Sequence, residues 1–230
     1  MERVHFESIA STNDYAKANR AAGRDLLITA TEQTGGRGTK GRAFSSKKGG
    51  VYLSMLQFHE NLSAKDAFMV MASTATAVCE TLRDYGLNPV IKWANDIFVD
   101  DKKICGILIE NTFSGNRIAS SVVGIGLNVS NRLETELADI AVTMEQATGK
   151  SFCVDEVRER LIAELQKPRS MDEYLAYIGY MGKRVTLILG EERIPATLIS
   201  VEKDGRLCAE TADGIKFFSA AEVSLRLDKE

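Results

Sequence analysis

Residues 26–58 have the sequence LLITATEQTGGRGTKGRAFSSKKGGVYLSMLQF, in which two apolar runs flank a glycine-rich basic segment. The runs Leu26–Thr31 and Val51–Phe58 predict buried β-strands, because they are short, apolar and rich in β-branched or aromatic residues. The segment between them is therefore held at both ends by a sheet.

The connecting loop, Gly35–Phe44, contains four glycines and three cations. Consecutive backbone N–H groups in such a loop can form a nest for phosphate or carboxylate. Arg37, Lys40 and Arg42 would add charge-assisted hydrogen bonds. A flexible, solvated basic loop is the alternative that the decapeptide alone leaves open.

Helical and strand patterns alternate on either side of this loop, which predicts a mixed α+β fold with a largely antiparallel sheet. Capping and apolar spacing predict helices over 13–22, 155–167 and 171–180. Another helix is predicted to begin at a capping box formed by Ser63 and Asp66 and to end at about Tyr85. Further strands are expected at 90–92, 97–99, 104–111 and 118–127.

The pattern changes after Gly182 to short strands, expected at 184–189, 193–201, 206–210, 215–218 and 223–227. The pairs Asp204-Gly205 and Asp213-Gly214 fit tight hairpin turns. We therefore expect a catalytic domain over 1–181 and a small SH3-like β-barrel over 182–230.

Composition limits the function classes. The net charge is -3 and the pI about 5.6, which does not favour a nucleic-acid partner. The four cysteines form no CxxC pair, which argues against a zinc or dithiol site. Because the chain has neither a signal-peptide pattern nor an apolar run of membrane-spanning length, a cytoplasmic protein without membrane contact is expected.

A second informative segment, Lys92–Glu110, has the sequence KWANDIFVDDKKICGILIE and includes the only tryptophan. Asn95 or Asp96 could bind Mg²⁺ directly or through water, and Lys103 could neutralise a reacting carboxylate or phosphate. Gly106 would let the backbone approach a ligand. An ordinary solvated hairpin turn is the alternative for this segment alone.

Together these segments closely resemble the biotin protein ligase family. The motifs occur in the family's order and cover about residues 3–130; they are Ser11-Thr12-Asn13, Gln33 with GGRGTKGRAF, GGVYLSM at 49–55, KWANDIFV with KKICGILIE, and GIGLNV at 124–129. The resemblance implies a class II synthetase-like ligase domain. It also implies ATP-dependent attachment of biotin, through biotinoyl-5'-AMP, to a lysine of a biotin carboxyl carrier protein or domain.

The resemblance also implies roles for individual residues, with ATP and biotin as substrates and Mg²⁺ as the metal. Expected biotin-binding residues are Ser11, Thr12, Asn13, Gln33, Gly36, Arg37, Lys103, Gly106 and Gly124. Expected ATP-binding residues are Gly38, Thr39, Lys40, Arg42, Phe44, Lys92, Asn95 and Asn128. Expected catalytic residues are Lys103, Arg37 and Arg42, and the expected Mg²⁺ ligand is Asp96.

Three positions depart from the family's pattern. Thr39 stands where the loop usually has another arginine, so looser retention of the adenylate is expected. Phe44 replaces a common tryptophan and can still stack on adenine, although it lacks an indole N–H. Ala94 replaces the proline of KWPND, which removes a fixed φ angle.

Two other function classes compete with a biotin ligase. A lipoate ligase or lipoyl/octanoyl transferase has a related domain, but the GRGxxGR loop, KWxND and the C-terminal barrel favour biotin. A non-catalytic biotin sensor would not need both Arg37 and Lys103. A DNA-binding repressor is not expected, since the first ligase motif begins at Ser11. The acceptor carboxylase and the choice between monomer and homodimer stay open.

Overall fold

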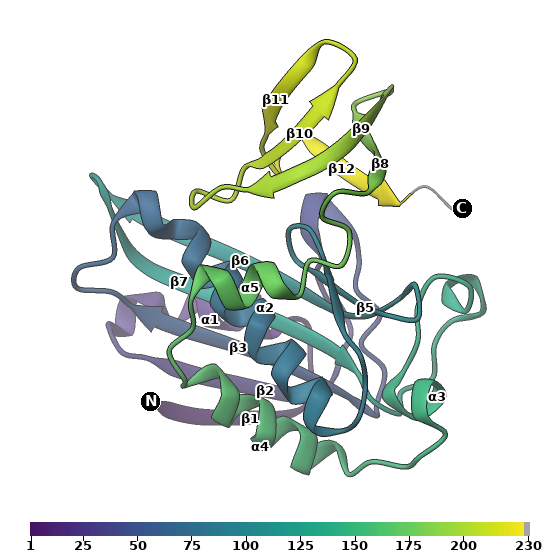
Figure 1. Cartoon of the computed structure of the whole chain (residues 1–230). Helices are drawn as coiled ribbons and strands as arrows, with labels where there is room; N and C mark the ends of the chain where they lie inside the picture. Colours follow the sequence, from purple (N-terminus) through teal and green to yellow (C-terminus); the bar gives the residue numbers. More distant parts are fainter. Residues whose placement is uncertain (228–230) are drawn as a thin grey trace.

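The computed structural model describes residues 1–227 and contains two β-sheets (Figure 1). The larger sheet has seven strands in the order β1-β2-β3-β7-β6-β5-β4. Only the β1–β2 pair is parallel, which confirms the predicted mixed, largely antiparallel sheet. The strands are β1 (Glu2–Ile9), β2 (Leu26–Gln33), β3 (Gly50–Phe58), β4 (Val90–Lys92), β5 (Asp96–Val99), β6 (Lys102–Ser114) and β7 (Arg117–Asn128).

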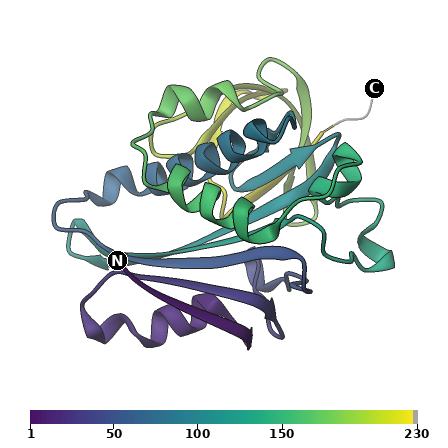
Figure 2. The ribbon, with the colours of Figure 1, turned by 90° about the horizontal axis from the view of Figure 1, so that it is seen from below.

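Helices cover both faces of this sheet (Figure 2). On one face α1 packs over a small core that includes Leu26 and Ile28. Leu27, between them in sequence, belongs to the larger core on the opposite face. This alternation is the period of two expected of a strand buried on both sides. The helices are α1 (Thr12–Ala18), α2 (Ala67–Asp84), α3 (Met144–Thr148), α4 (Val154–Leu165) and α5 (Met171–Ala176).

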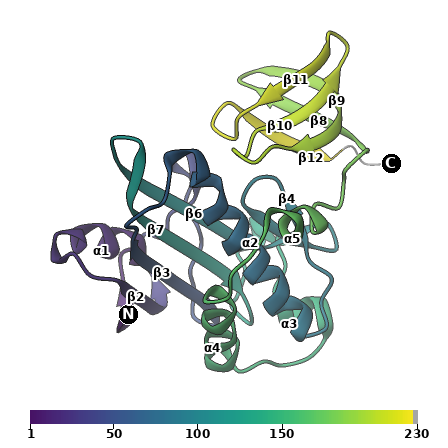
Figure 3. The same ribbon diagram turned by 60° about the vertical axis from the view of Figure 1, so that its left-hand side comes forward.

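The C-terminal strands form a separate antiparallel sheet of five strands in the order β11-β10-β9-β8-β12, which curls into a barrel-like unit beside the larger sheet (Figure 3). The predicted hairpin glycines, Gly205 and Gly214, have positive φ values of 85° and 101°. The small C-terminal β-unit is therefore confirmed. Its strands are β8 (Arg184–Leu189), β9 (Glu192–Val201), β10 (Leu207–Thr211), β11 (Gly214–Phe218) and β12 (Val223–Leu227).

Several local expectations were wrong. The helix expected over 13–22 ends at Ala18 and is followed by a 3-10 turn, Arg20–Ala22. Ser63 caps a 3-10 turn at Ala64–Asp66 and forms no capping box, because its hydroxyl accepts from the nearby Lys65 N–H. The helix expected over 171–180 ends at Ala176. Strand β1 and the short helix α3 were not predicted.

The turn between β4 and β5 is fixed by buried hydrogen bonds from distant residues. The hydroxyl of Tyr180 accepts from the Trp93 backbone N–H at 2.7 Å and donates to the Ile91 carbonyl at 2.5 Å. The Trp93 indole Nε1–H donates to the Gly205 carbonyl at 3.0 Å, across to the C-terminal unit. Trp93 is therefore a packing residue, and it joins the two sheets.

Replacing Trp93 with Phe should destabilise the protein, because Trp93 is only 5% exposed and the buried Gly205 carbonyl would lose its donor. We expect the free energy of unfolding to fall by about 1–3 kcal/mol, measured by urea denaturation. The exposed Phe113, changed to Leu, should stay within about 0.5 kcal/mol of the wild type. Equal stability of Trp93→Phe and the wild type would show that this hydrogen bond does not stabilise the fold.

Candidate active site

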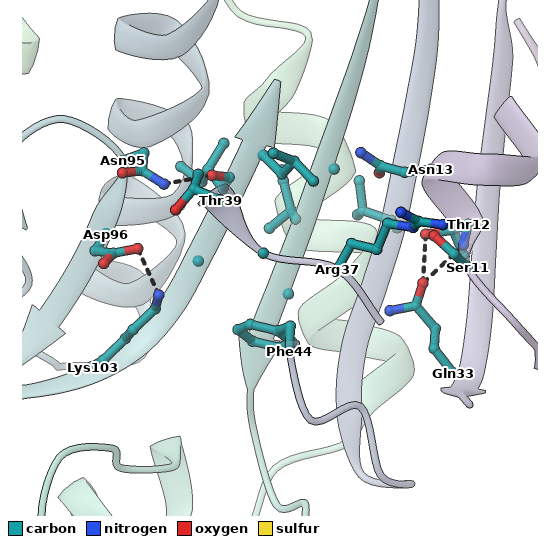
Figure 4. Close-up of a pocket in the computed structure, with 18 residues that line it drawn as sticks. Ser11, Thr12, Asn13, Gln33, Arg37, Thr39, Phe44, Asn95, Asp96 and Lys103 are labelled. Atoms are coloured by element: carbon teal, nitrogen blue, oxygen red, sulfur yellow. Dashed lines mark hydrogen bonds and ion pairs between the residues drawn. The ribbon is translucent and has the colours of Figure 1, made fainter. Parts of the chain in front are cut away.

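A pocket lies on the α1 side of the larger sheet, where α1, the glycine-rich loop and the β5–β6 hairpin converge (Figure 4). It brings together both segments that the sequence singled out. Predicted residues that line it are Ser11, Thr12, Asn13, Gln33, Arg37, Gly38, Thr39, Phe44, Asn95, Asp96, Lys103, Gly106 and Gly124.

One end of the pocket is built from neutral hydrogen-bonding groups. The side-chain oxygen of Gln33 accepts from the Thr12 backbone N–H at 2.8 Å and lies 3.0 Å from the Thr12 hydroxyl oxygen. The Gln33 amide nitrogen donates to the Ser46 hydroxyl at 2.9 Å, which fixes the orientation of the amide. Ser11 caps α1 by accepting from the Asp14 N–H, and it also lines the pocket.

The opposite end is charged. Lys103 Nζ lies 2.6 Å from an oxygen of Asp96, across the β5–β6 hairpin. Both side chains are about one-third exposed, so the pair can exchange partners with an incoming ligand. Asn95 donates its side-chain N–H to the Ile107 carbonyl at 2.8 Å, and this bond anchors the strand turn beside the pocket.

The glycine-rich loop is an ordered hairpin. The Phe44 N–H donates to the Gly36 carbonyl at 2.9 Å, and the Gly38 N–H donates to the Arg42 carbonyl at 2.7 Å. A 3-10 turn at Thr39–Gly41 closes the tip, with Lys40 at a φ of 56°. The expected anion nest is therefore wrong for these N–H groups, because the protein itself uses them.

Side chains of the loop also face the pocket, beside the backbone of Gly38. Arg37 reaches the mouth, where its Nε–H donates to a carboxylate oxygen of Asp14 at 2.7 Å. Partial burial acts to raise the pKa of Asp14, but hydrogen bonds and charge from Lys17 and Arg37 lower it overall. The Asp14 carboxylate is thus a stable counter-ion for Arg37 in the absence of an anionic ligand.

Phe44 lies between the two ends of the pocket, over adjacent glycines of β6 and β7 (Figure 4). A Cβ atom at Gly126 would come within 2.4 Å of the Phe44 ring, and one at Gly106 within 3.1 Å. Gly106 was expected to admit a ligand. In this structure it admits the Phe44 ring and the end of the Lys103 side chain.

The remaining predicted residues do not line the pocket. Gly36 packs its backbone against Phe44 and Ser46, and Lys40 Nζ lies 3.4 Å from the Val223 carbonyl and 3.4 Å from Ser224 Oγ in the C-terminal unit. Asn128 is 5% exposed and its amide bonds Val142 and Asn131, so its side chain secures the end of β7. Arg42 and Lys92 are also outside the lining.

Lys92 is one of several cationic side chains beside the charged end of the pocket. Burial lowers its pKa most, and neighbouring cations add to this effect although Asp96 opposes it. Those cations are Arg226, Lys103 and Arg42. Such a concentration of positive charge suits a polyanion.

Sequence reasoning missed several contributors. The apolar lining residues are Leu53, Ile107, Leu108 and Ile125, and Gly126 adds a further close-approach position. Gly126 lies inside the GIGLNV motif, which could have revealed it. Ser54, beneath the pocket, was visible as a polar residue in the middle of the apolar run VYLSMLQF. The apolar residues carried no such signal, because only strand register brings them to the pocket.

Within residues 1–227, no thiol or histidine is placed for nucleophilic chemistry in this pocket. Burial raises the pKa of the Cys105 thiol, which therefore stays protonated and unreactive at neutral pH. His5 and His59 are not among the residues that line the pocket. The arrangement is suited to positioning and charge stabilisation.

Comparison with known proteins agrees with the pocket. The model of the "Biotin/lipoate A/B protein ligase family" matches residues 5–128, and that of the "Biotin protein ligase C terminal domain" matches residues 180–226. The bifunctional ligase/repressor BirA of Escherichia coli is 30% identical over 95% of this chain and 72% of its own length. The biotin–[acetyl-CoA-carboxylase] ligase of Mycobacterium tuberculosis is 27% identical over 93% of this chain and 85% of its own length.

A solved structure extends the similarity to the whole fold. The biotin protein ligase of Aquifex aeolicus, in complex with biotin and ATP, superposes with a TM-score of 0.76 and 28% identity, covering 99% of each chain. The family match spans more than half of this chain and contains the pocket residues up to Gly126. The chain therefore belongs to the biotin/lipoate A/B protein ligase family.

Proposed function

We propose that this chain activates biotin with ATP to biotinoyl-5'-AMP and transfers the biotinoyl group to a lysine of a biotin carboxyl carrier protein or domain. The observation that supports this function is a single pocket with two chemically different ends. Thr12 and Gln33 form a neutral hydrogen-bonding end, and Lys103 and Asp96 form a charged end. A substrate with a polar neutral head and a reacting carboxylate matches both.

The neutral end favours biotin over lipoate or an octanoyl group. The ureido ring of biotin has both N–H donors and a carbonyl acceptor, which can pair with the groups of Ser11, Thr12 and Gln33. A dithiolane ring or an alkyl chain has neither, and so could not pair with these polar groups. We propose that Asn13, Gly36 and Gly124 complete this end.

At the charged end two anions must meet. A carboxylate oxygen of biotin attacks the α-phosphorus of ATP, and pyrophosphate leaves; the lysine amine of the acceptor then attacks the acyl carbon, and AMP leaves. Lys103 and Arg37 would offset the repulsion between the carboxylate and the α-phosphate and stabilise the charge that builds between them. Arg37 would exchange Asp14 for the ligand.

ATP would occupy the part of the pocket next to Phe44, whose ring offers a surface for adenine. Gly38, Thr39 and Asn95 line the same region. Arg42 and Lys92 would act on the polyphosphate through their charge. We also assign Lys40 and Asn128 to the nucleotide side, where they would support the walls without touching ATP.

Mg²⁺ fits this site only together with ATP. Across residues 1–227, no group of three or more His, Cys, Asp or Glu side chains could hold a metal ion. Mg²⁺ is commonly held by one or two carboxylates plus substrate phosphates. Asp96 would supply the carboxylate, and the ion would neutralise phosphate charge.

Further parts of the proposal concern the setting of the enzyme. No helix within residues 1–227 is long and apolar enough to cross a membrane. We propose a cytoplasmic enzyme that does not bind DNA, with the domain division at residues 181 and 182 supported by the two separate sheets.

Biotin-dependent exchange of pyrophosphate into ATP tests the function directly. A biotin ligase should show exchange with biotin and none with lipoate. A lipoate enzyme would show the reverse or no exchange, and a sensor would bind biotin without exchange. Either of the last two outcomes would refute the proposed reaction.

Lys103→Ala should abolish most adenylate formation, because it removes the cation at the charged end. We expect kcat/KM for pyrophosphate exchange to fall by about 10²–10³-fold. Lys102→Ala is the matched control, since the Lys102 amine bonds the Ala138 carbonyl and does not line the pocket. Normal exchange in a folded Lys103→Ala protein would remove this residue from the mechanism.

Thr39→Arg should lengthen the retention of biotinoyl-AMP, because it restores a cation that relatives commonly place in this loop. We expect the half-life of the bound adenylate, measured in a chase with unlabelled biotin, to rise by about tenfold, as one charge-assisted hydrogen bond would give. Thr39→Gln, which has a long but neutral side chain, is the control that separates the effect of charge from the effect of side-chain size. Equal release from Thr39→Arg and the wild type would contradict the expectation.

A further inference from the structure

The side chain of Asn13 crosses strand β7 beneath the neutral end of the pocket. Asn13 lies in the first turn of α1 and is 5% exposed. It passes over Gly124, where a Cβ atom would come within 2.1 Å of the Asn13 side-chain oxygen. Gly124 is therefore needed for the Asn13 amide to lie on the sheet.

The two ends of this amide meet different strands. Asn13 Oδ1 lies 2.5 Å from the Ser54 hydroxyl oxygen on β3, and Asn13 Nδ2 donates to Glu110 Oε2 on β6 at 3.1 Å. Strands β3 and β6 flank β7 on either side. The amide thus bridges three strands at the floor of the pocket.

Glu110 decides which way the amide points. An ionised carboxylate only accepts hydrogen bonds, so it must face the Asn13 nitrogen, and the Asn13 oxygen must face Ser54. Lys17 holds Glu110 in place, with its Nζ 2.8 Å from Glu110 Oε1. Lys17 also lies 3.0 Å from an oxygen of Asp14, the counter-ion of Arg37.

This orientation passes on to the residues of the pocket wall. Ser54 has one hydroxyl hydrogen, which the 2.5 Å contact with Asn13 requires. Ser54 has no second hydrogen for its 2.7 Å contact with the Thr12 hydroxyl, so Thr12 must donate in that contact. Gln33 then accepts from the Thr12 backbone N–H. The carboxylate therefore sets the hydrogen-bond direction along Asn13, Ser54 and Thr12.

We propose that Glu110 is a positioning residue for the head group of the acyl substrate: by orienting the Asn13 amide, it sets which groups of the pocket floor donate and which accept hydrogen bonds. The inference rests on the proposed function, because the head group is taken to be the ureido ring of biotin. Glu110 itself is not among the residues that line the pocket. It acts through Asn13.

Glu110→Gln tests the inference, because a glutamine of the same shape can donate as well as accept and no longer fixes the amide. In pyrophosphate exchange by the full chain, we expect the KM for biotin to rise about tenfold. The kcat at saturating biotin should stay within about twofold, and the KM for ATP should not change. This split indicates lost binding of the head group without lost chemistry.

Glu80→Gln is the matched control. Glu80 has a similar exposure, 31% against 34% for Glu110, and its carboxylate likewise has a hydrogen-bond donor, Tyr177, and a nearby cation, Arg83. It lies on α2, outside the pocket. Its kinetic constants should equal those of the wild type.

A double-mutant cycle distinguishes positioning from general stability. If Glu110 acts through Asn13, Glu110→Gln should add less than about twofold to the biotin KM in an Asn13→Ala background. A full tenfold effect in that background, or an unchanged biotin KM in the single variant, would overturn the inference while the ligase function stands. A wild-type chain without biotin-dependent exchange would overturn both.

Discussion

The absence of side chains at two positions of β7 is the constraint on which the site depends. At Gly124 the sheet leaves room for the Asn13 amide, and at Gly126 it leaves room for the Phe44 ring. Both positions face the side of the sheet covered by α1. The start of α1 and the end of the glycine-rich loop can therefore rest directly on the strands, and the pocket forms between them.

Charge is organised around this floor in two separate groups. Lys103 pairs with Asp96 at one end, and Arg37 pairs with Asp14 at the mouth. Both pairs are partly exposed, so each contributes little to folding, and both cations can turn toward an anionic substrate. The C-terminal unit supports this arrangement from outside: it meets the basic loop at Lys40 and the β4–β5 turn at Trp93.

Much of the fold was predictable, because local patterns agreed with tertiary packing. The two apolar runs around the loop became β2 and β3, and the tight turns at Asp-Gly pairs fell at hairpins. Strand β1 was not predicted because it is a largely exposed edge strand with little apolar pattern. Its pairing with β2 stabilises it more than burial of its own side chains does. Helix α3 has only five residues, too few for a clear period.

The sequence by itself determined the family and most of the pocket-lining polar residues, because side-chain chemistry and the order of motifs are written along the chain. Tertiary structure alone decided which of these residues meet. Asn128 is turned into the protein, the Gly38 and Phe44 N–H groups donate to carbonyls of their own loop, and Glu110 accepts from the Asn13 amide that lies over β7. These contacts depend on strand register and on the packing of α1 against the sheet, which set distances between residues far apart in the chain.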